Sequence, residues 1–140
     1  MSKKQNSENC LYHSINALSR VITRIAEEEF NSVKLSPSAV FILCEVNSTS
    51  GISIGAVSKI LQLSPSTLTR LVEGLEEKDL IKRIQKGKFT ELHPTKKSKN
   101  LQGEILTCRR NFESKCDLLI GTKSRKKLVR KINDVTSSLT

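Results

Sequence analysis

The side chains of this 140-residue chain that are best suited to recognition chemistry are small hydroxyls followed by one cation, in a segment that indicates a helix over residues 65–79. Ser64-Pro65 provides an N-cap and a proline at the first helical position. The expected inward stripe, spaced i, i+3, i+4 and i+7, consists of Leu68, Leu71, Val72 and Leu75. Off this stripe, near the helix start, lie Ser66, Thr67, Thr69 and Arg70.

These four side chains suit the reading of double-stranded DNA. Small hydroxyls allow close approach to base edges, an arginine can bind guanine in bidentate fashion, and a helix N-terminus favours a phosphate. Each hydroxyl taken singly has an equally good interpretation as a helix cap. We expect the acidic residues further along the helix to face away from the DNA groove; they are Glu73, Glu76, Glu77 and Asp79.

A short helix and a hairpin flank this segment. Ser53 can cap a helix whose expected inward residues are Ile54, Val57, Ile60 and Leu61, and Gln62-Leu63-Ser64 makes a tight link to the next helix. Residues 81–85 and 89–92 flank Lys86-Gly87-Lys88, and this pattern predicts a small hairpin with glycine at its turn. Two short helices followed by a basic hairpin are typical of a winged helix-turn-helix.

Long helices are predicted on both sides of this region. The first carries an apolar stripe of Leu11, Ile15, Leu18, Ile22, Ile25 and Phe30. Ser36-Pro37 begins a second, which buries Val40, Phe41, Leu43 and Cys44 and ends at a loop over residues 47–51. After Pro94-Thr95, two further helices separated by Gly121 carry Leu101, Ile105, Cys108, Phe112 and Leu119, then Leu128, Ile132, Val135 and Leu139. The predicted fold class is therefore mainly α with a small β-hairpin wing, in a single domain over residues 1–140.

The net charge of +10 is unevenly distributed. Residues 1–81 carry 8 Lys or Arg and 9 Asp or Glu, whereas residues 82–140 carry 16 and 5. The basic half predicts a polyanion partner, because Lys and Arg release the counterions condensed on phosphates, although a solubilising surface fits the charge equally well. Only 4% of the residues are aromatic, which favours double-stranded DNA over partners bound by base stacking. A second basic cluster, interpreted as a solvated face of the last helix rather than a DNA-flanking contact, comprises Lys123, Arg125, Lys126, Lys127, Arg130 and Lys131.

Two segments of the sequence resemble the multiple-antibiotic-resistance regulator (MarR) family: residues 35–38, Leu-Ser-Pro-Ser, and residues 58–83. The order of helices extends this resemblance over nearly the whole chain. The resemblance implies a homodimeric transcriptional regulator, usually a repressor, that binds a pseudo-palindromic operator of double-stranded DNA. Its recognition helix would enter the major groove, its wing would touch the minor groove, and its first and last helices would interlock between subunits.

Carried over to this chain, the resemblance makes residues 36–95 the DNA-binding lobe and residues 8–33 and 96–140 a helical dimerisation region. Dimer symmetry would place the two recognition helices roughly 34–36 Å apart. The implied DNA contacts are Lys59, Ser64, Ser66, Thr67, Thr69, Arg70, Arg83, Lys86 and Lys88. The wing departs from the family, because Lys86-Gly87-Lys88 stands where an Asp-x-Arg pair usually carries the arginine that enters the minor groove.

Effector and redox sites are expected on the first helix. Cys10 precedes that helix, where an organic-peroxide-sensing branch of the family carries its reactive thiol, and Tyr12 is the candidate for the neighbouring tyrosine. Side chains that could reach a small-molecule crevice by analogy with the family are Tyr12, His13, Asn16 and Arg20, and the alternative is that they simply face solvent. Cys44 and Cys108 are expected to act as small core residues.

An enzyme is disfavoured, because His13 and His93 look isolated and the sequence contains neither a glycine-rich phosphate loop nor a Cys-x-x-C metal pair. No cofactor or metal is expected. No apolar segment follows residues 1–6 and the longest apolar run spans residues 40–44, so we expect a cytoplasmic protein without membrane contact. Two alternatives to a specific DNA-binding regulator stay open: a winged-helix protein-interaction module without specific DNA binding, and a redox switch acting through Cys10.

Overall fold

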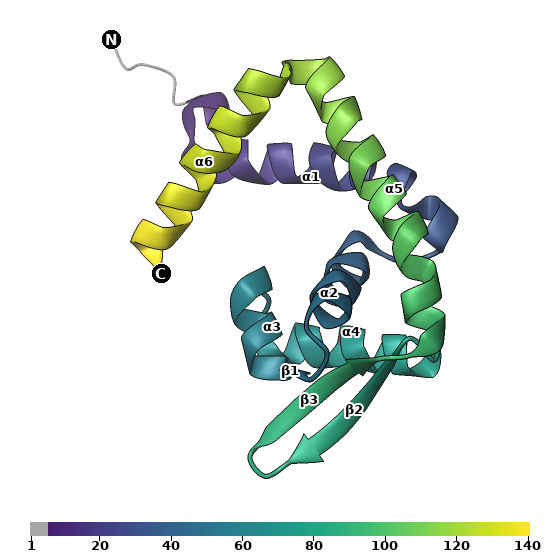
Figure 1. Ribbon diagram of the computed structural model, residues 1–140. Helices are drawn as coiled ribbons and strands as arrows, with labels where there is room; N and C mark the ends of the chain where they lie inside the picture. Colours follow the sequence, from purple (N-terminus) through teal and green to yellow (C-terminus); the bar gives the residue numbers. More distant parts are fainter. Residues whose placement is uncertain (1–5) are drawn as a thin grey trace.

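The computed structural model describes residues 6–140, so residues 1–5, part of the N-terminal segment on which the expected cytoplasmic location partly rests, lie outside it. It contains six α-helices, two 3₁₀ turns and a three-stranded sheet within these residues (Figure 1). In chain order the elements are η1 (Ser7–Asn9), α1 (Leu11–Glu29), η2 (Asn31–Val33), α2 (Pro37–Ser48), β1 (Ile52–Ser53), α3 (Ile54–Leu61), α4 (Pro65–Glu77), β2 (Ile81–Lys86), β3 (Phe89–Pro94), α5 (Lys96–Ile120) and α6 (Thr122–Leu139).

The helix starts expected from the sequence are confirmed by their caps. The side chains of Ser36, Ser53 and Ser64 accept hydrogen bonds from backbone N–H groups three residues on, at 3.3, 3.1 and 3.3 Å. Thr95 does the same at the start of α5, accepting from the N–H of Ser98 at 3.1 Å. Each bond satisfies a donor that a helix start would otherwise leave without a partner. These caps fix where each helix begins and therefore which of its faces meets the core.

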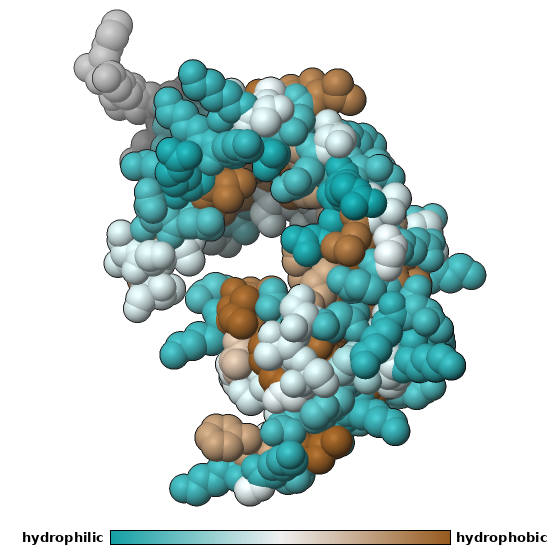
Figure 2. Space-filling view, viewed as in Figure 1, coloured by the Kyte–Doolittle hydropathy of each residue, from teal (hydrophilic) through white to brown (hydrophobic). Residues whose placement is uncertain are grey.

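The two ends of the chain form an arch of helices above a compact lobe (Figure 1). α5 rises from the sheet to the top of the molecule, where Gly121, at φ +87°, breaks it from α6. Figure 2 shows an open gap between the end of α6 and the lobe that holds α3. No residue of α6 is buried, and the apolar stripes predicted for α1 and α6 lie largely on the surface of the single chain.

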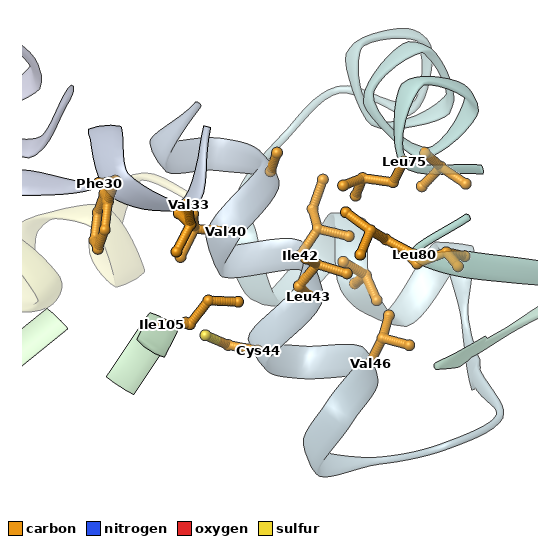
Figure 3. Packing of buried hydrophobic residues seen from close by; sticks show 14 of the residues in the cluster. Phe30, Val33, Val40, Ile42, Leu43, Cys44, Val46, Leu75, Leu80 and Ile105 are labelled. Carbon is orange, nitrogen blue, oxygen red and sulfur yellow. The ribbon is translucent and has the colours of Figure 1, made fainter. Parts of the chain in front are cut away.

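The lobe is organised around α2. Six of its twelve residues are buried: Ala39, Val40, Ile42, Leu43, Cys44 and Val46. Leu68, Val72 and Leu75 of α4 belong to the same cluster, as do Ile105 and Cys108 of α5, and Figure 3 shows several of these residues packed together. Cys44 and Cys108 are thus core residues, as expected, and both thiols are free. The buried residues of α2 spread over more than one row of the helix, so both α4 and α5 pack on it.

The prediction that Ile60 faces the core is wrong. Ile60 keeps the spacing of the inward stripe of α3, yet its side chain is 55% exposed, while Val57 of the same helix is fully buried. Val57 is buried in the core and Ile54 and Leu61 pack against it partly buried, so the inward stripe of α3 runs at i, i+3 and i+7 and leaves Ile60 outside it. The apolar pattern of a helix this short does not distinguish the two positions.

The wing contains one strand more than the sequence predicts. β1 pairs antiparallel with β3 through Ile52↔Leu92 and Ser53↔Glu91, giving the strand order β1-β3-β2. Two residues are too few to produce an alternating pattern, so this segment looked like the end of a loop. The hairpin is also tighter and longer than expected: β2 and β3 pair from Ile81↔Pro94 to Lys86↔Phe89, which leaves a two-residue turn, Gly87-Lys88, with φ +58° at the glycine.

None of the helices described over residues 6–140 is long and apolar enough to cross a membrane.

The seating of α4 on α2 can be tested by a matched pair of truncations. We expect Leu68→Ala to lower the free energy of unfolding by about 2–5 kcal/mol, because Leu68 is fully buried and its loss leaves a cavity under α4. Ile60→Ala, in the same helix-turn-helix but exposed, should change it by less than about 0.5 kcal/mol. Urea unfolding followed by far-ultraviolet circular dichroism, at one protein concentration, measures both. Equal losses for the two variants would contradict this packing.

Candidate nucleic-acid interface

The start of α4 carries a small network of hydroxyls. Besides capping the helix, Ser64 donates its hydroxyl to Oγ1 of Thr67 at 2.9 Å, and its Oγ lies 3.4 Å from that of Ser66. Ser64 and Ser66 are exposed, and Thr67 and Thr69 are half-buried. Ser64 therefore has a structural role as a cap, and it presents the side chain of Ser66 to solvent in a defined geometry.

Arg70 lies one turn further along α4 and is exposed. Its helix is held from beneath by Leu68 and Val72, both fully buried. Arg70 forms no ion pair within the described residues, so its guanidinium is free to meet a partner outside the chain. The structure therefore brings the four predicted recognition residues together on one exposed helix start.

The link between α3 and α4 is a turn of fixed shape. Gln62 adopts a left-handed conformation, at φ +54°, and its side-chain amide donates to the carbonyl of Lys59 at 3.2 Å. Ser58 donates its hydroxyl to the carbonyl of Leu63 at 2.6 Å. These bonds set how α3 and α4 cross. Lys59, in the last turn of α3, is exposed beside this turn.

Arg83 is engaged within the protein. Its guanidinium lies 2.8 Å from the carboxylate of Glu76, so it joins β2 to the second half of α4. From the sequence we expected Glu76 to face away from DNA and Arg83 to contact it. Nothing in the sequence indicated that the two side chains would pair. The role of Arg83 as a DNA contact stays a prediction, and this ion pair would have to open for that contact to form.

The outer face of the wing carries a second connected group. Lys86 lies 3.6 Å from the carboxylate of Glu91, which also contacts Nε2 of His93 at 3.0 Å. Nδ1 of His93 lies 3.2 Å from the hydroxyl of Ser50 in the loop before β1. The hydrogen bond from His93, with Lys86 nearby, holds the pKa of Glu91 below its usual range. This group ties the loop before β1 to the wing.

His93 is therefore not isolated, contrary to the interpretation from sequence. A hydroxyl, an imidazole and a carboxylate lie in a row, but Ser50 is exposed and the carboxylate is shared with Lys86. We assign the row to fixing the wing. The described residues contain no group of three or more His, Cys, Asp or Glu side chains that could hold a metal ion.

Two lysines, one after α4 and one at the start of α5, hold the lobe together through backbone carbonyls. Lys97 donates to the carbonyl of Lys78 at 2.8 Å, and Lys78 donates to the carbonyl of Lys34 at 3.3 Å. Cations at the C-terminal end of a helix such as α4 also interact favourably with its dipole. The exposed cations at the tip and outer face of the wing are Lys82, Lys86 and Lys88.

The candidate effector residues at the start of α1 and along it are not buried in the single chain. Cys10, Tyr12, His13 and Arg20 are exposed, and the amide of Asn16 donates to the carbonyl of Tyr12 at 2.7 Å. Cys10 occupies the N-cap position of α1 as an exposed free thiol, without a side-chain capping bond. Their roles in ligand binding or redox sensing stay predictions.

A groove of about 480 Å³ lies instead where α5 faces the end of α1 and the start of α2. Its floor is a cluster of phenylalanines: Phe30 meets Phe41 edge-on at 6.2 Å and lies against Phe112 at 6.3 Å between ring centroids. Arg109 lies 5.0 Å from the centre of the Phe41 ring. Burial raises the pKa of Cys44 and Arg109 opposes that rise. Sequence reasoning missed this groove because its residues come from three helices and look like ordinary core positions.

One member of the basic cluster on the last helix has a structural role within the chain. Arg125 forms ion pairs with Asp117 and, at 3.4 Å, with Glu113, so it clamps α6 to α5 across the break at Gly121. The hydrogen bond from Arg125 lowers the pKa of Asp117. The other five cations of this cluster form no ion pair within residues 6–140, and all five are exposed.

Comparison with known proteins adds to this geometry. The sequence model of the MarR family matches residues 35–87, which run from the start of α2 to the wing turn. A search of the curated proteins found no match. Among solved structures, the fold is similar to that of the transcriptional repressor CouR bound to a 23-mer DNA duplex, with a TM-score of 0.84, 14% identity, and 97% of this chain and 99% of that one covered.

Two further structures show the same likeness along the whole chain. MepR of S. aureus, solved as a DNA complex, gives a TM-score of 0.78 at 16% identity, over 96% of this chain and 100% of that one. CouR of Rhodococcus jostii bound to p-coumaroyl-CoA gives 0.76 at 14% identity, over 97% and 95%. At such identities the likenesses establish the fold alone, and the MarR family model matches residues 35–87, so the chain is similar to the MarR family over its helix-turn-helix and most of its wing.

Proposed function

We propose that this protein is a homodimeric regulator of transcription that binds a pseudo-palindromic site on double-stranded DNA through α4. The observation that carries the proposal is the start of α4, where Ser66 and Arg70 are exposed on a helix whose opposite face is fully buried. Such a helix can enter the major groove without disturbing the core. CouR and MepR, which share the fold, are both solved with DNA, and this supports the proposal. The proposal includes repression rather than activation of transcription, and a cytoplasmic location.

The proposed dimer would cover the apolar surface of the terminal helices. Exposed apolar side chains on these helices are Leu11, Ile15, Leu18 and Val21 of α1, Leu118, Leu119 and Ile120 at the end of α5, and Leu128, Val129, Ile132, Val135 and Leu139 of α6. Apolar surface this extensive marks an interaction site in a soluble protein. A second copy would bury it by bringing the same helices together about a two-fold axis.

We also propose that the groove over the phenylalanine cluster, rather than the residues of α1, receives a small effector. Phe41 and Phe112 offer an apolar wall, and Arg109 and Arg110 lie at its edge. This combination suits a ligand with an apolar or aromatic body and an anionic group. The p-coumaroyl-CoA complex of CouR shows that a protein of this fold binds such a molecule.

The protein-interaction module remains the second candidate, favoured by one observation. The wing has a two-residue turn and lacks the family's Asp-x-Arg pair, so a sequence-reading element is missing. The two candidates differ in the ratio of affinities for selected and random duplexes: a ratio near one, with binding driven by charge alone, would favour the interaction module. A Cys10 switch would instead make DNA release depend on peroxide and be abolished by Cys10→Ser.

Arg70 provides the direct test of the recognition helix. On a duplex selected from a genomic library, we expect Arg70→Lys and Arg70→Ala each to weaken specific binding by about 1–3 kcal/mol for each half-site, because alanine removes the contact and lysine lacks the rigid planar fork that holds guanine in a fixed geometry. Binding to random duplex should fall little for Arg70→Lys, which keeps the charge. Fluorescence anisotropy over a range of salt concentrations measures both. If Arg70→Lys bound the selected duplex as tightly as the parent, α4 would not be reading the bases through this residue.

The dimer is tested by placing a charge on the apolar face of α6. We expect Ile132→Asp to shift the protein towards monomer and to weaken operator binding, since a carboxylate would be buried between subunits. Asn133→Asp adds the same charge at the neighbouring exposed position and should leave the dimer intact. Sedimentation velocity over a range of protein concentrations reports the association state. A parent protein that stays monomeric, or an Ile132→Asp variant as dimeric as the parent, would contradict this arrangement.

A further inference from the structure

Phe89 is an aromatic side chain that the fold does not use. The chain has four phenylalanines. Phe30, Phe41 and Phe112 pack with one another in the lobe, whereas Phe89 is 66% exposed. It is the first residue of β3, directly after the turn Gly87-Lys88, so it stands at the tip of the wing. An exposed ring at the end of a projecting hairpin contributes little to the core and is accessible to a partner, and what kind of partner it suits depends on its neighbours.

Cations flank this ring on both sides. Its direct cross-strand partner is Lys86, and Lys88 precedes it in the chain. Directly paired residues of antiparallel strands point to the same face of a sheet, so Phe89 and Lys86 share the outer face of the wing. Ile84, the partner of Glu91 and 42% exposed, lies one step further along that face. An apolar group set between lysines matches a polyanion better than it matches an apolar protein surface.

The wing tip is held in shape by its own hydrogen bonds. Thr90 donates its hydroxyl to the side-chain carbonyl of Gln85 at 2.7 Å, and the amide of Gln85 donates to the carbonyl of Gly87 at 3.0 Å. On the outer face, Glu91 links Lys86 to His93 and so to the base of the sheet. The ring of Phe89 is therefore presented by an ordered strand, and little conformational entropy has to be lost when it binds.

We propose that Phe89 is the minor-groove contact of this wing, and that its ring enters as an apolar wedge against a base step while Lys86 and Lys88 bind the flanking phosphates. Proteins that bind the minor groove insert phenylalanine and other apolar side chains between base steps, which partly unstacks and bends the duplex. The wedge would select steps that unstack easily, such as pyrimidine–purine steps, at positions that α4 does not touch. This inference rests on the proposed DNA-binding function and adds a reading element where the arginine of the family is missing.

The experiment compares the parent with Phe89→Ala, Phe89→Leu and Lys88→Ala on a selected duplex that carries 2-aminopurine at each step of the flanking minor groove in turn. The parent should raise the fluorescence of the probe at one step in each half-site. Phe89→Ala should lose this signal and bind the selected duplex about ten- to a hundredfold more weakly, with an unchanged salt slope because no charge is removed. Phe89→Leu, still a wedge, should keep most of the signal. Lys88→Ala should keep the signal and lower the magnitude of the salt slope by about 1.8, which is about 0.9 for each of the two subunits.

Four outcomes decide between the alternatives. The pattern above supports the wedge. If the parent binds specifically and Phe89→Ala matches it in affinity and 2-aminopurine signal, the wedge is wrong and the proposed function stands. If Phe89→Ala changes self-association beyond the dimer but not DNA binding, the ring contacts another copy and the wedge is also wrong. If the parent prefers no duplex over random DNA, the proposed function fails and the wedge with it. Unfolding curves confirm that the variants are folded, which is expected because Phe89 is exposed.

Discussion

The structure depends on the burial of one stripe of α4 against α2. Leu68, Val72 and Leu75 are almost completely withdrawn from solvent, and the helix they lock in place exposes Ser66 and Arg70 at the opposite side. The direction in which Arg70 points is therefore decided by apolar packing beneath it. The cap at Ser64 determines where the helix starts, and the fixed turn at Gln62 determines how it crosses α3. A recognition surface of small polar groups can stay rigid only because its scaffold contributes the stability.

The charge of the chain has several distinct uses in this fold. Lys78 and Lys97 bind backbone carbonyls at the end of α4, Arg83 pairs with Glu76, and Arg125 joins α5 to α6. Exposed cations that could meet an external polyanion lie on the wing and beside the helix-turn-helix, and five more lie on α6. Under the proposed function, the wing lysines would bind phosphate, α4 would read the major groove, and the exposed ring at the wing tip would act in the minor groove.

Local patterns predicted the parts of the fold whose signals are local. Ser-Pro pairs located two helix starts, i, i+3, i+4 spacing located the stripe of α4, and a glycine between basic strands located the wing. The features that the sequence did not reveal have a common cause, which is that they depend on partners far apart in the chain. β1 is visible only through its pairing with β3, the ion pair of Arg83 only through Glu76, and the groove only through the meeting of Phe30, Phe41 and Phe112. Ile60 was mispredicted for another reason: the apolar residues of α3 cover more than one face, and the stripe of Ile54, Val57 and Leu61 is the one that packs on the core.

The most direct measurement of the central claim is selection of bound duplexes from a genomic library by the full-length protein, followed by alignment of the recovered sequences. A symmetric dimer that places two copies of α4 in successive major grooves predicts a shared pseudo-palindrome whose half-sites are centred about 10–10.5 base pairs apart. Recovery of duplexes without a common motif, or with a single unrepeated half-site, would contradict the account.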